Sequence, residues 1–195
     1  MNSVFFDVDT QIDFLYPAGA LYVPGAEQLL PIVARLNHHA VARGIPLVST
    51  TDAHTENDEE FRTYPPHCVA GTAGQTKPAA TLFEGRTVIP CTGPADAWIS
   101  APQYIVEKRR LDCFTNPNLP PLLDALAAER YVVYGVVTEL CVRCAAFGLL
   151  ARGGRVELVE DAVRSLSEEA NRRMLAEFTA AGGTLTTSER VLASA

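Results

Sequence analysis

The chain has 195 residues, of which 48% are hydrophobic and 20% are charged. This balance is typical of a soluble globular protein rather than a disordered one, and the length suits one α/β domain, so we expect a single domain over residues 1–195. The net charge is −7, and the longest basic run is Lys108, Arg109 and Arg110. Nucleic acid is therefore not expected as a partner.

The apolar segment at the N-terminus is short, because Asp7 and Asp9 interrupt it. It resembles neither a signal peptide nor a segment able to span a bilayer, so we expect a cytoplasmic protein with no membrane partner. The five cysteines, at positions 68, 91, 113, 141 and 144, are odd in number and do not form a disulfide-framework pattern. Free thiols are the expectation.

Strand and helix patterns alternate along the chain. In chain order they predict strand 3–6, helix 25–42, strand 45–49, an irregular loop 53–86, strand 87–89, helix 95–100, strand 104–107, helix 120–129, strand 130–137, helix 138–152, strand 156–159, helix 168–181 and strand 183–186. This alternation predicts an α/β fold with a doubly wound, mostly parallel sheet and helices on both faces. The long loop is expected to carry function.

Reactive side chains follow three of the predicted strands. Asp9 follows the first strand, Lys108 follows the strand at 104–107, and Cys141 lies in the first turn of the helix after Val137. Ligands of open α/β sheets bind beyond the carboxyl ends of the strands, so these side chains are expected to converge. A thiol at a helix N-terminus near a cation is suited to nucleophilic attack, with Asp9 as its proton partner.

Asp52 and His54 lie two residues apart after the strand at 45–49, so in an extended segment both side chains project to one face. Together with His67 in the long loop they form a candidate divalent-metal set. The alternative is that all three are hydrogen-bonded loop residues without a metal.

Five segments together resemble the isochorismatase-like cysteine hydrolases, and among them the nicotinamidase (pyrazinamidase) branch. These segments are Asp9-Thr-Gln-Ile-Asp13-Phe14, Asp52-Ala-His54, Tyr64-Pro-Pro-His67-Cys68-Val-Ala-Gly71-Thr72, Glu107-Lys108 and Gly135-Val-Val-Thr138-Glu-Leu-Cys141-Val-Arg143. Each is a weak signal alone, but they occur in the expected order across nearly the whole chain. The resemblance implies a three-layer Rossmann-like fold.

The resemblance also implies roles for individual residues. Asp9, Lys108 and Cys141 would form the catalytic triad, and the backbone amides of Val137 and Cys141 an oxyanion hole, with a cis peptide between Val136 and Val137. The implied activity is hydrolysis of nicotinamide to nicotinate and ammonia through a thioester on Cys141, a step of NAD salvage.

The same resemblance implies a metal site and a ring-binding pair. Asp52, His54 and His67 would hold one divalent ion, either zinc, iron(II) or manganese, with a fourth ligand best aligned at Glu60 and with Glu59 and Asp58 as rivals. Phe14 and Tyr64 would flank the substrate ring. Tyr64 stands where the family usually has tryptophan.

Other functions stay open at this point. A related cysteine hydrolase could act on another small amide or on a carbamoyl or ureido compound. From a different class, Cys141 and Cys144 form a Cys-x-x-Cys pattern that a non-hydrolytic metal-binding or thiol redox module could use. The partner expected in the first two cases is a small-molecule amide, and the sequence does not distinguish a monomer from a homo-oligomer.

Overall fold

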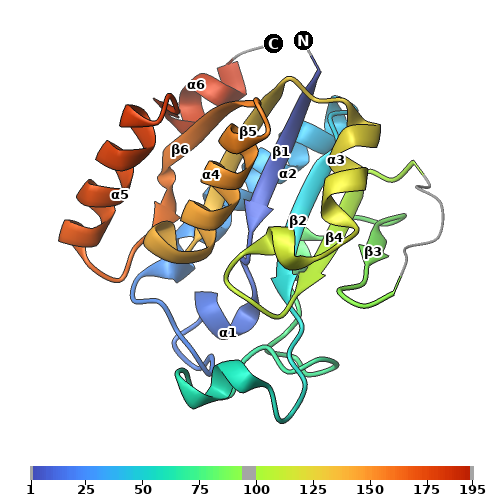
Figure 1. Ribbon diagram of the computed structural model, residues 1–195, viewed down its shortest axis with the longest axis vertical. Coiled ribbons are helices and arrows are strands. Elements are labelled where there is room, and N and C mark those ends of the chain that lie inside the picture. Colours follow the sequence, from blue (N-terminus) through green and yellow to red (C-terminus); the bar gives the residue numbers. More distant parts are fainter. Residues whose placement is uncertain (1, 94–99, 194–195) are drawn as a thin grey trace.

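A seven-stranded sheet organises the chain in the computed structural model, which describes residues 2–93 and 100–193. Its strands are β1 (Ser3–Val8), β2 (Leu47–Asp52), β3 (Thr87–Ile89), β4 (Gln103–Lys108), β5 (Arg130–Val136), β6 (Arg155–Arg164) and β7 (Thr184–Thr186). Their order is β3-β4-β2-β1-β5-β6-β7, and all neighbouring strands are parallel (Figure 1). The order reverses at β1, which is where this class of fold binds ligands.

Helices cover both faces of the sheet. They are α1 (Ile12–Leu15), α2 (Leu30–Ala42), α3 (Leu119–Leu126), α4 (Arg143–Ala151), α5 (Glu168–Ala180) and α6 (Ser188–Ala193). Buried residues of α3, α4 and α5 pack in one hydrophobic cluster, and those of α1, α2 and α6 pack in another on the opposite face (Figure 1). The three-layer, doubly wound α/β fold expected from the sequence is therefore confirmed.

The central strand β1 shows why the sheet is buried on both sides. Val4, Phe6 and Val8 belong to one hydrophobic cluster, and Phe5 belongs to the other. Alternate residues of a strand point to opposite faces, so a parallel strand covered by helices on both faces needs a continuous apolar run. Burying each phenylalanine contributes about 1.5–3 kcal/mol.

The structure differs from the sequence expectation mainly at short or irregular elements. The helices α1 and α6 were not predicted, because four and six residues are too few to show helical periodicity. The segment expected as one helix over 138–152 begins instead as a π-helical turn, Thr138–Val142, before α4. Strand β6 extends to Arg164, beyond the predicted end at 159.

Two further sequence expectations concern specific segments. The helix expected at 95–100 falls on 94–99, which lie outside the described residues. Among the described residues, no helix has the length and apolar composition needed to cross a membrane.

A buried polar network fastens the long 53–86 loop to β1. Lys77, from this loop, lies with its Nζ 3.0 Å from Asp7 Oδ2 and donates to Thr10 Oγ1 at 2.5 Å. Asp7 also accepts hydrogen bonds from Thr10 Oγ1 and from Asn37 Nδ2, both at 2.8 Å. All four residues are buried. The loop is therefore anchored two residues from Asp9.

Replacing Lys77 should destabilise the fold, and a second substitution should repair much of the loss. Lys77→Met leaves the Asp7 carboxylate buried without its cation, which is expected to cost about 3–5 kcal/mol of unfolding free energy. In Lys77→Met/Asp7→Asn the buried charge is gone, and the amide can still accept from Asn37 and donate to Thr10. Urea denaturation measures both. A double variant no more stable than the single one would contradict this account.

Candidate active site

The ends of three strands bring Asp9, Lys108 and Cys141 together. Asp9 follows β1, Lys108 ends β4, and Cys141 lies in the π-helical turn after β5. The Nζ atom of Lys108 lies 2.9 Å from Asp9 Oδ2 and donates to Cys141 Sγ at 3.6 Å. All three side chains are buried. The convergence expected from the sequence is present.

The position of Asp9 is set by its neighbour on β2. The Asp9 amide donates to the Thr50 carbonyl at 3.2 Å, and the Thr50 hydroxyl donates to Asp9 Oδ1 at 2.6 Å. Asp9 has a φ of 50°, a left-handed conformation that aspartate tolerates better than most residues. One carboxylate oxygen is thus held by Thr50, and the other faces Lys108.

The charges of the cluster follow from burial and mutual contact. Burial lowers the pKa of Lys108, but the carboxylates of Asp52 and Asp9 outweigh it and hold that pKa well above its usual value. Burial raises the pKa of Cys141, and although Lys108 opposes this, Asp9 and Asp52 add to it. Burial also raises the pKa of Asp52, to about 7, although Lys108 opposes the shift. At neutral pH the cluster therefore holds an ammonium and a neutral thiol.

The backbone before Cys141 contains a glycine with positive φ and a cis peptide. Gly135 has a φ of 124°, and a Cβ there would lie 2.1 Å from the Val8 carbonyl oxygen, so only glycine lets β5 come this close to β1. The next peptide, between Val136 and Val137, is cis, as the family resemblance implied.

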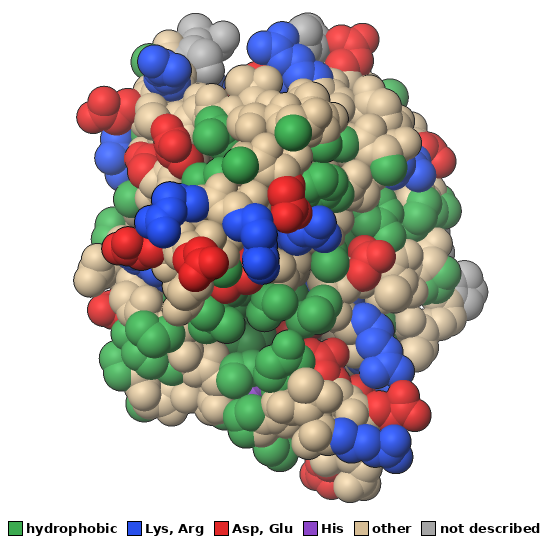
Figure 2. All heavy atoms as spheres, turned by 60° about the vertical axis from the view of Figure 1, so that its left-hand side comes forward, with side chains coloured by type: hydrophobic (Ala, Val, Ile, Leu, Met, Phe, Trp, Pro, Cys, Tyr) green, Lys and Arg blue, Asp and Glu red, His purple; other side chains and the backbone are tan. Residues whose placement is uncertain are grey.

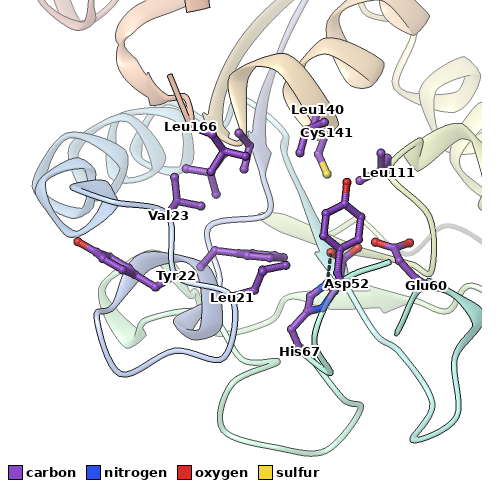
Figure 3. Close-up of a pocket in the computed structure, with 14 residues that line it drawn as sticks. Leu21, Tyr22, Val23, Asp52, Glu60, His67, Leu111, Leu140, Cys141 and Leu166 are labelled. Atoms are coloured by element: carbon purple, nitrogen blue, oxygen red, sulfur yellow. Dashed lines mark ion pairs between the residues drawn. The ribbon is translucent and has the colours of Figure 1, made fainter. Parts of the chain in front are cut away.

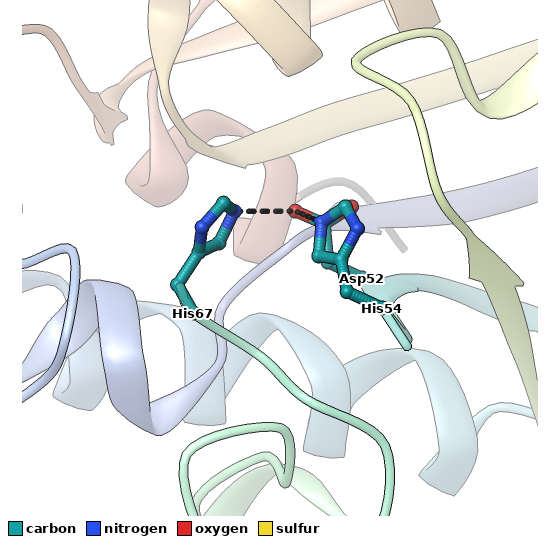
Figure 4. Close-up of side chains that lie close together, drawn as sticks. All are labelled: Asp52, His54 and His67. Carbon is teal, nitrogen blue, oxygen red and sulfur yellow. Dashed lines mark ion pairs between the residues drawn. The ribbon is translucent and has the colours of Figure 1, made fainter. Parts of the chain in front are cut away.

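Asp52, His54 and His67 form a second buried cluster beside the first. Their ligand atoms all lie within 4.8 Å of one another, and both Nε2 atoms lie 3.9 Å from Asp52 Oδ2 (Figure 4). His67 Nδ1 hydrogen-bonds the Pro65 carbonyl at 2.8 Å, so Nδ1 carries the proton and Nε2 is free to bind. Burial lowers the pKa of His67, which favours the neutral ring that metals require.

A pocket joins the two clusters and is lined mostly by hydrophobic side chains. Its lining consists of Phe14, Leu21, Tyr22, Val23, Asp52, Glu60, Tyr64, His67, Leu111, Val136, Val137, Leu140, Cys141 and Leu166 (Figure 3). Figure 2 shows hydrophobic side chains gathered around a hollow in the lower half of the molecule. Phe14 and Tyr64, the expected ring-binding residues, both line the pocket.

Comparison with known proteins identifies the family. Residues 3–190 match the model of the isochorismatase domain. The chain belongs to the isochorismatase family. Among solved structures it is similar to a pyrazinamidase of Pyrococcus horikoshii in complex with zinc, at 28% identity and a TM-score of 0.79, covering 96% of this chain and 99% of that one. A protein from L. infantum in complex with nicotinate gives 28% identity and a TM-score of 0.80, covering 96% and 93%.

A curated relative with a different substrate in its name also matches. The N-carbamoylsarcosine amidase of an Arthrobacter species is 26% identical over 149 residues, which are 76% of this chain and 54% of that protein. The family match supports an amidohydrolase, and the mixed names of the relatives leave its substrate open.

The structure separates the three candidates for a fourth ligand in this isochorismatase-family protein. Glu60 lines the pocket beside Asp52 and His67, although it is not part of the three-residue cluster. Glu59 is exposed and pairs with Arg110 at 2.9 Å. Asp58 lies 3.3 Å from His54 Nδ1, on the far side of that ring from Asp52, and accepts from the Glu60 amide at 3.1 Å. Glu60 therefore has the best placement.

Gln11 is a structural residue of the site for which sequence analysis predicts no role. Its side chain accepts from the Asp52 amide at 2.7 Å and donates to the Asp52 carbonyl at 2.8 Å, which fixes the end of β2 against the Asp9 segment. Its position within the segment Asp9 to Phe14, which resembles the family, is the sequence feature that could have indicated a role for Gln11. Asp13 also supports the loop, accepting from the amides of Cys68 and Ala20 at 2.7 and 2.9 Å.

Charge changes next to Cys141 should move its pKa in opposite directions. Asp9→Asn removes a negative charge and is expected to lower the pKa of the thiol, whereas Lys108→Met removes the cation and is expected to raise it. The ultraviolet absorbance of the thiolate as a function of pH measures both, with Cys141→Ser as the blank for the other four cysteines. Shifts in the same direction, in variants shown by circular dichroism to be folded, would refute the electrostatic account.

Proposed function

We propose that this chain hydrolyses the carboxamide of a neutral nitrogen heterocycle, with nicotinamide as the leading substrate, to the carboxylic acid and ammonia. The observation that carries this proposal is the contact of Lys108 Nζ with both Asp9 and Cys141, beside a pocket that Cys141 lines together with Asp52 and His67. The proposed nucleophile and two of the three candidate metal ligands thus line one cavity, and the proposed proton acceptor, Asp9, shares the Lys108 ammonium with the nucleophile.

Asp9 and Cys141 carry the proposed chemistry. As the sulfur attacks the carbonyl carbon, Asp9 takes the thiol proton, and the carbonyl electron pair moves onto oxygen. The amides of Val137 and Cys141 are proposed to hold this oxyanion, a contribution of about 3 kcal/mol per donor. When the C–N bond breaks, Asp9 gives its proton to the leaving nitrogen, and ammonia departs from a thioester on Cys141.

Water completes the cycle in the same site. Asp9 accepts a proton from the water as its oxygen attacks the thioester carbon, and the C–S bond breaks to release the acid. The proton on Asp9 then returns to the sulfur. Lys108 keeps its proton throughout, because its pKa lies well above neutrality, and it balances the charges of Asp9 and of the sulfur.

Asp52, His54 and His67 fit a divalent metal, with Glu60 as the fourth ligand. His54 Nε2 is buried and has no hydrogen-bond partner among the described residues, and it lies near the carboxylate of Asp52. Two imidazoles and carboxylates suit zinc, iron(II) or manganese. When bound, the metal would hold the ring nitrogen of the substrate and so orient the amide toward Cys141.

The pocket lining favours nicotinamide over carbamoyl amino acids, the second candidate substrates. Asp52 and Glu60 are acidic, and no lysine or arginine occurs among the lining residues. An N-carbamoyl amino acid carries a carboxylate that needs a cationic partner, whereas nicotinamide is neutral. Ammonia release from nicotinamide, pyrazinamide and N-carbamoylsarcosine separates the two candidates directly.

Cys141→Ala should lower ammonia release from nicotinamide by at least about 10³-fold, because losses of this order or larger follow removal of a catalytic nucleophile. The fold should persist, since the thiol is a small buried group. Cys144→Ala is the matched control, one helical turn away, and should retain activity. Activity in Cys141→Ala, or equal loss in both variants, would refute the nucleophile assignment and favour a redox pair.

Removal of the metal by a chelator should raise KM for nicotinamide more than it lowers kcat, because the proposed metal positions the ring rather than attacking the amide. His67→Ala should reproduce this effect and should reduce the zinc bound per chain. His38→Ala, an exposed histidine on α2, is the control and should change neither quantity. A chelated enzyme with unchanged KM would count against the metal assignment.

A further inference from the structure

The pocket has an apolar side opposite its metal-binding side. In Figure 3, Leu166 and Val23 lie on one side of the cavity, and Asp52, Glu60 and His67 lie on the other. Leu166 is 57% exposed, and among the described residues the other exposed large hydrophobic side chain is Val88, at 51%. A single exposed leucine is common, but this one continues the apolar lining of a pocket.

Two hydrogen bonds hold the Leu166 turn in place. Glu139 accepts from the Leu166 amide at 3.0 Å and from the Ser165 hydroxyl at 2.6 Å. Glu139 belongs to the same π-helical turn as Cys141. The backbone of Leu166, at the pocket rim, is therefore tied to the turn that carries Cys141.

Covering the exposed Leu166 side chain with an apolar surface removes both surfaces from water, which makes binding more favourable in free energy. A ring whose nitrogen lies toward Asp52 and His67 would direct its opposite edge toward the side of the pocket formed by Leu166 and Val23. An apolar group on that edge would cover Leu166 without meeting a charged side chain, since no charged residue lines this side of the pocket.

We propose that Leu166 is a specificity-determining residue that selects heterocyclic carboxamides bearing an apolar substituent on the ring edge away from the metal-binding atom. This inference rests on the proposed function for the orientation of the ring. It predicts that 5-methylnicotinamide binds at least as tightly as nicotinamide, and that the methyl group contacts Leu166.

Binding and turnover are measured separately to test it. Calorimetry in the Cys141→Ala background gives the Kd of nicotinamide and of 5-methylnicotinamide, with zinc present. Adding Leu166→Ala should weaken 5-methylnicotinamide about tenfold and nicotinamide by a smaller factor, since a buried methyl group and its partner atoms are lost. Leu166→Asn, which keeps the number and branching of side-chain heavy atoms, should weaken the methylated ligand similarly. Val88→Ala, on the edge strand β3, is the exposure-matched control and should change neither Kd.

The outcomes distinguish the two proposals. Equal weakening of both ligands by Leu166→Ala, no weakening, or no binding of either ligand would overturn the role of Leu166. Absence of ammonia release by the wild-type chain, together with Leu166-dependent binding, would overturn the proposed hydrolysis while supporting the role of Leu166. In active enzyme the same selectivity should appear in KM, with Leu166→Ala raising KM for 5-methylnicotinamide by a larger factor than KM for nicotinamide.

Discussion

The buried ammonium of Lys108 is the interaction on which the rest of the site depends. Removing a carboxylate from water costs several kcal/mol, and here Asp9 and Asp52 are both buried within reach of one cation. The parallel order β1, β2, β4 brings the three residues together, because their strand ends lie at one edge of the sheet. The same ammonium also contacts Cys141. One charge therefore both stabilises the buried carboxylates and lowers the cost of forming the thiolate.

Asp52 links this cluster to the histidines through a single carboxylate. Its Oδ1 contacts Lys108, and its Oδ2 faces the Nε2 atoms of His54 and His67. Any cation held by the histidines would compete with Lys108 for Asp52 and leave more of the ammonium's charge for Asp9 and the sulfur. Gln11 fixes the Asp52 backbone, so this coupling acts through a side chain with little freedom to move.

The sequence predicted the parts of the site that depend on strand order and local pattern. Strand ends of a parallel sheet must share an edge, and this is why Asp9, Lys108 and Cys141 could be placed together, and why Asp52 and His54 could be placed on one face. Contacts between residues far apart in the chain produce no recognisable spacing in the sequence. Nothing in the sequence distinguishes Lys77 from a solvent-exposed loop lysine, and only the structure shows that it is buried against Asp7. Leu166 likewise lies in a short connection after β6 whose direction depends on Glu139.

In the proposed function, most of the groups that would select the substrate lie on connections, and the groups that would cleave the amide lie at or just after strand ends. Asp9, Lys108 and Cys141, which would cleave the amide, lie at or within five residues of strand ends, where the register of β1, β2, β4 and β5 limits their movement. The pocket walls come from connections: the 53–86 loop contributes Tyr64 and His67, and the turn after β6 contributes Leu166. Loops tolerate change that strands do not. An arrangement of this kind would allow the loops of this chain to change while Asp9, Lys108 and Cys141 keep their geometry, in line with the rule that one fold can host several functions.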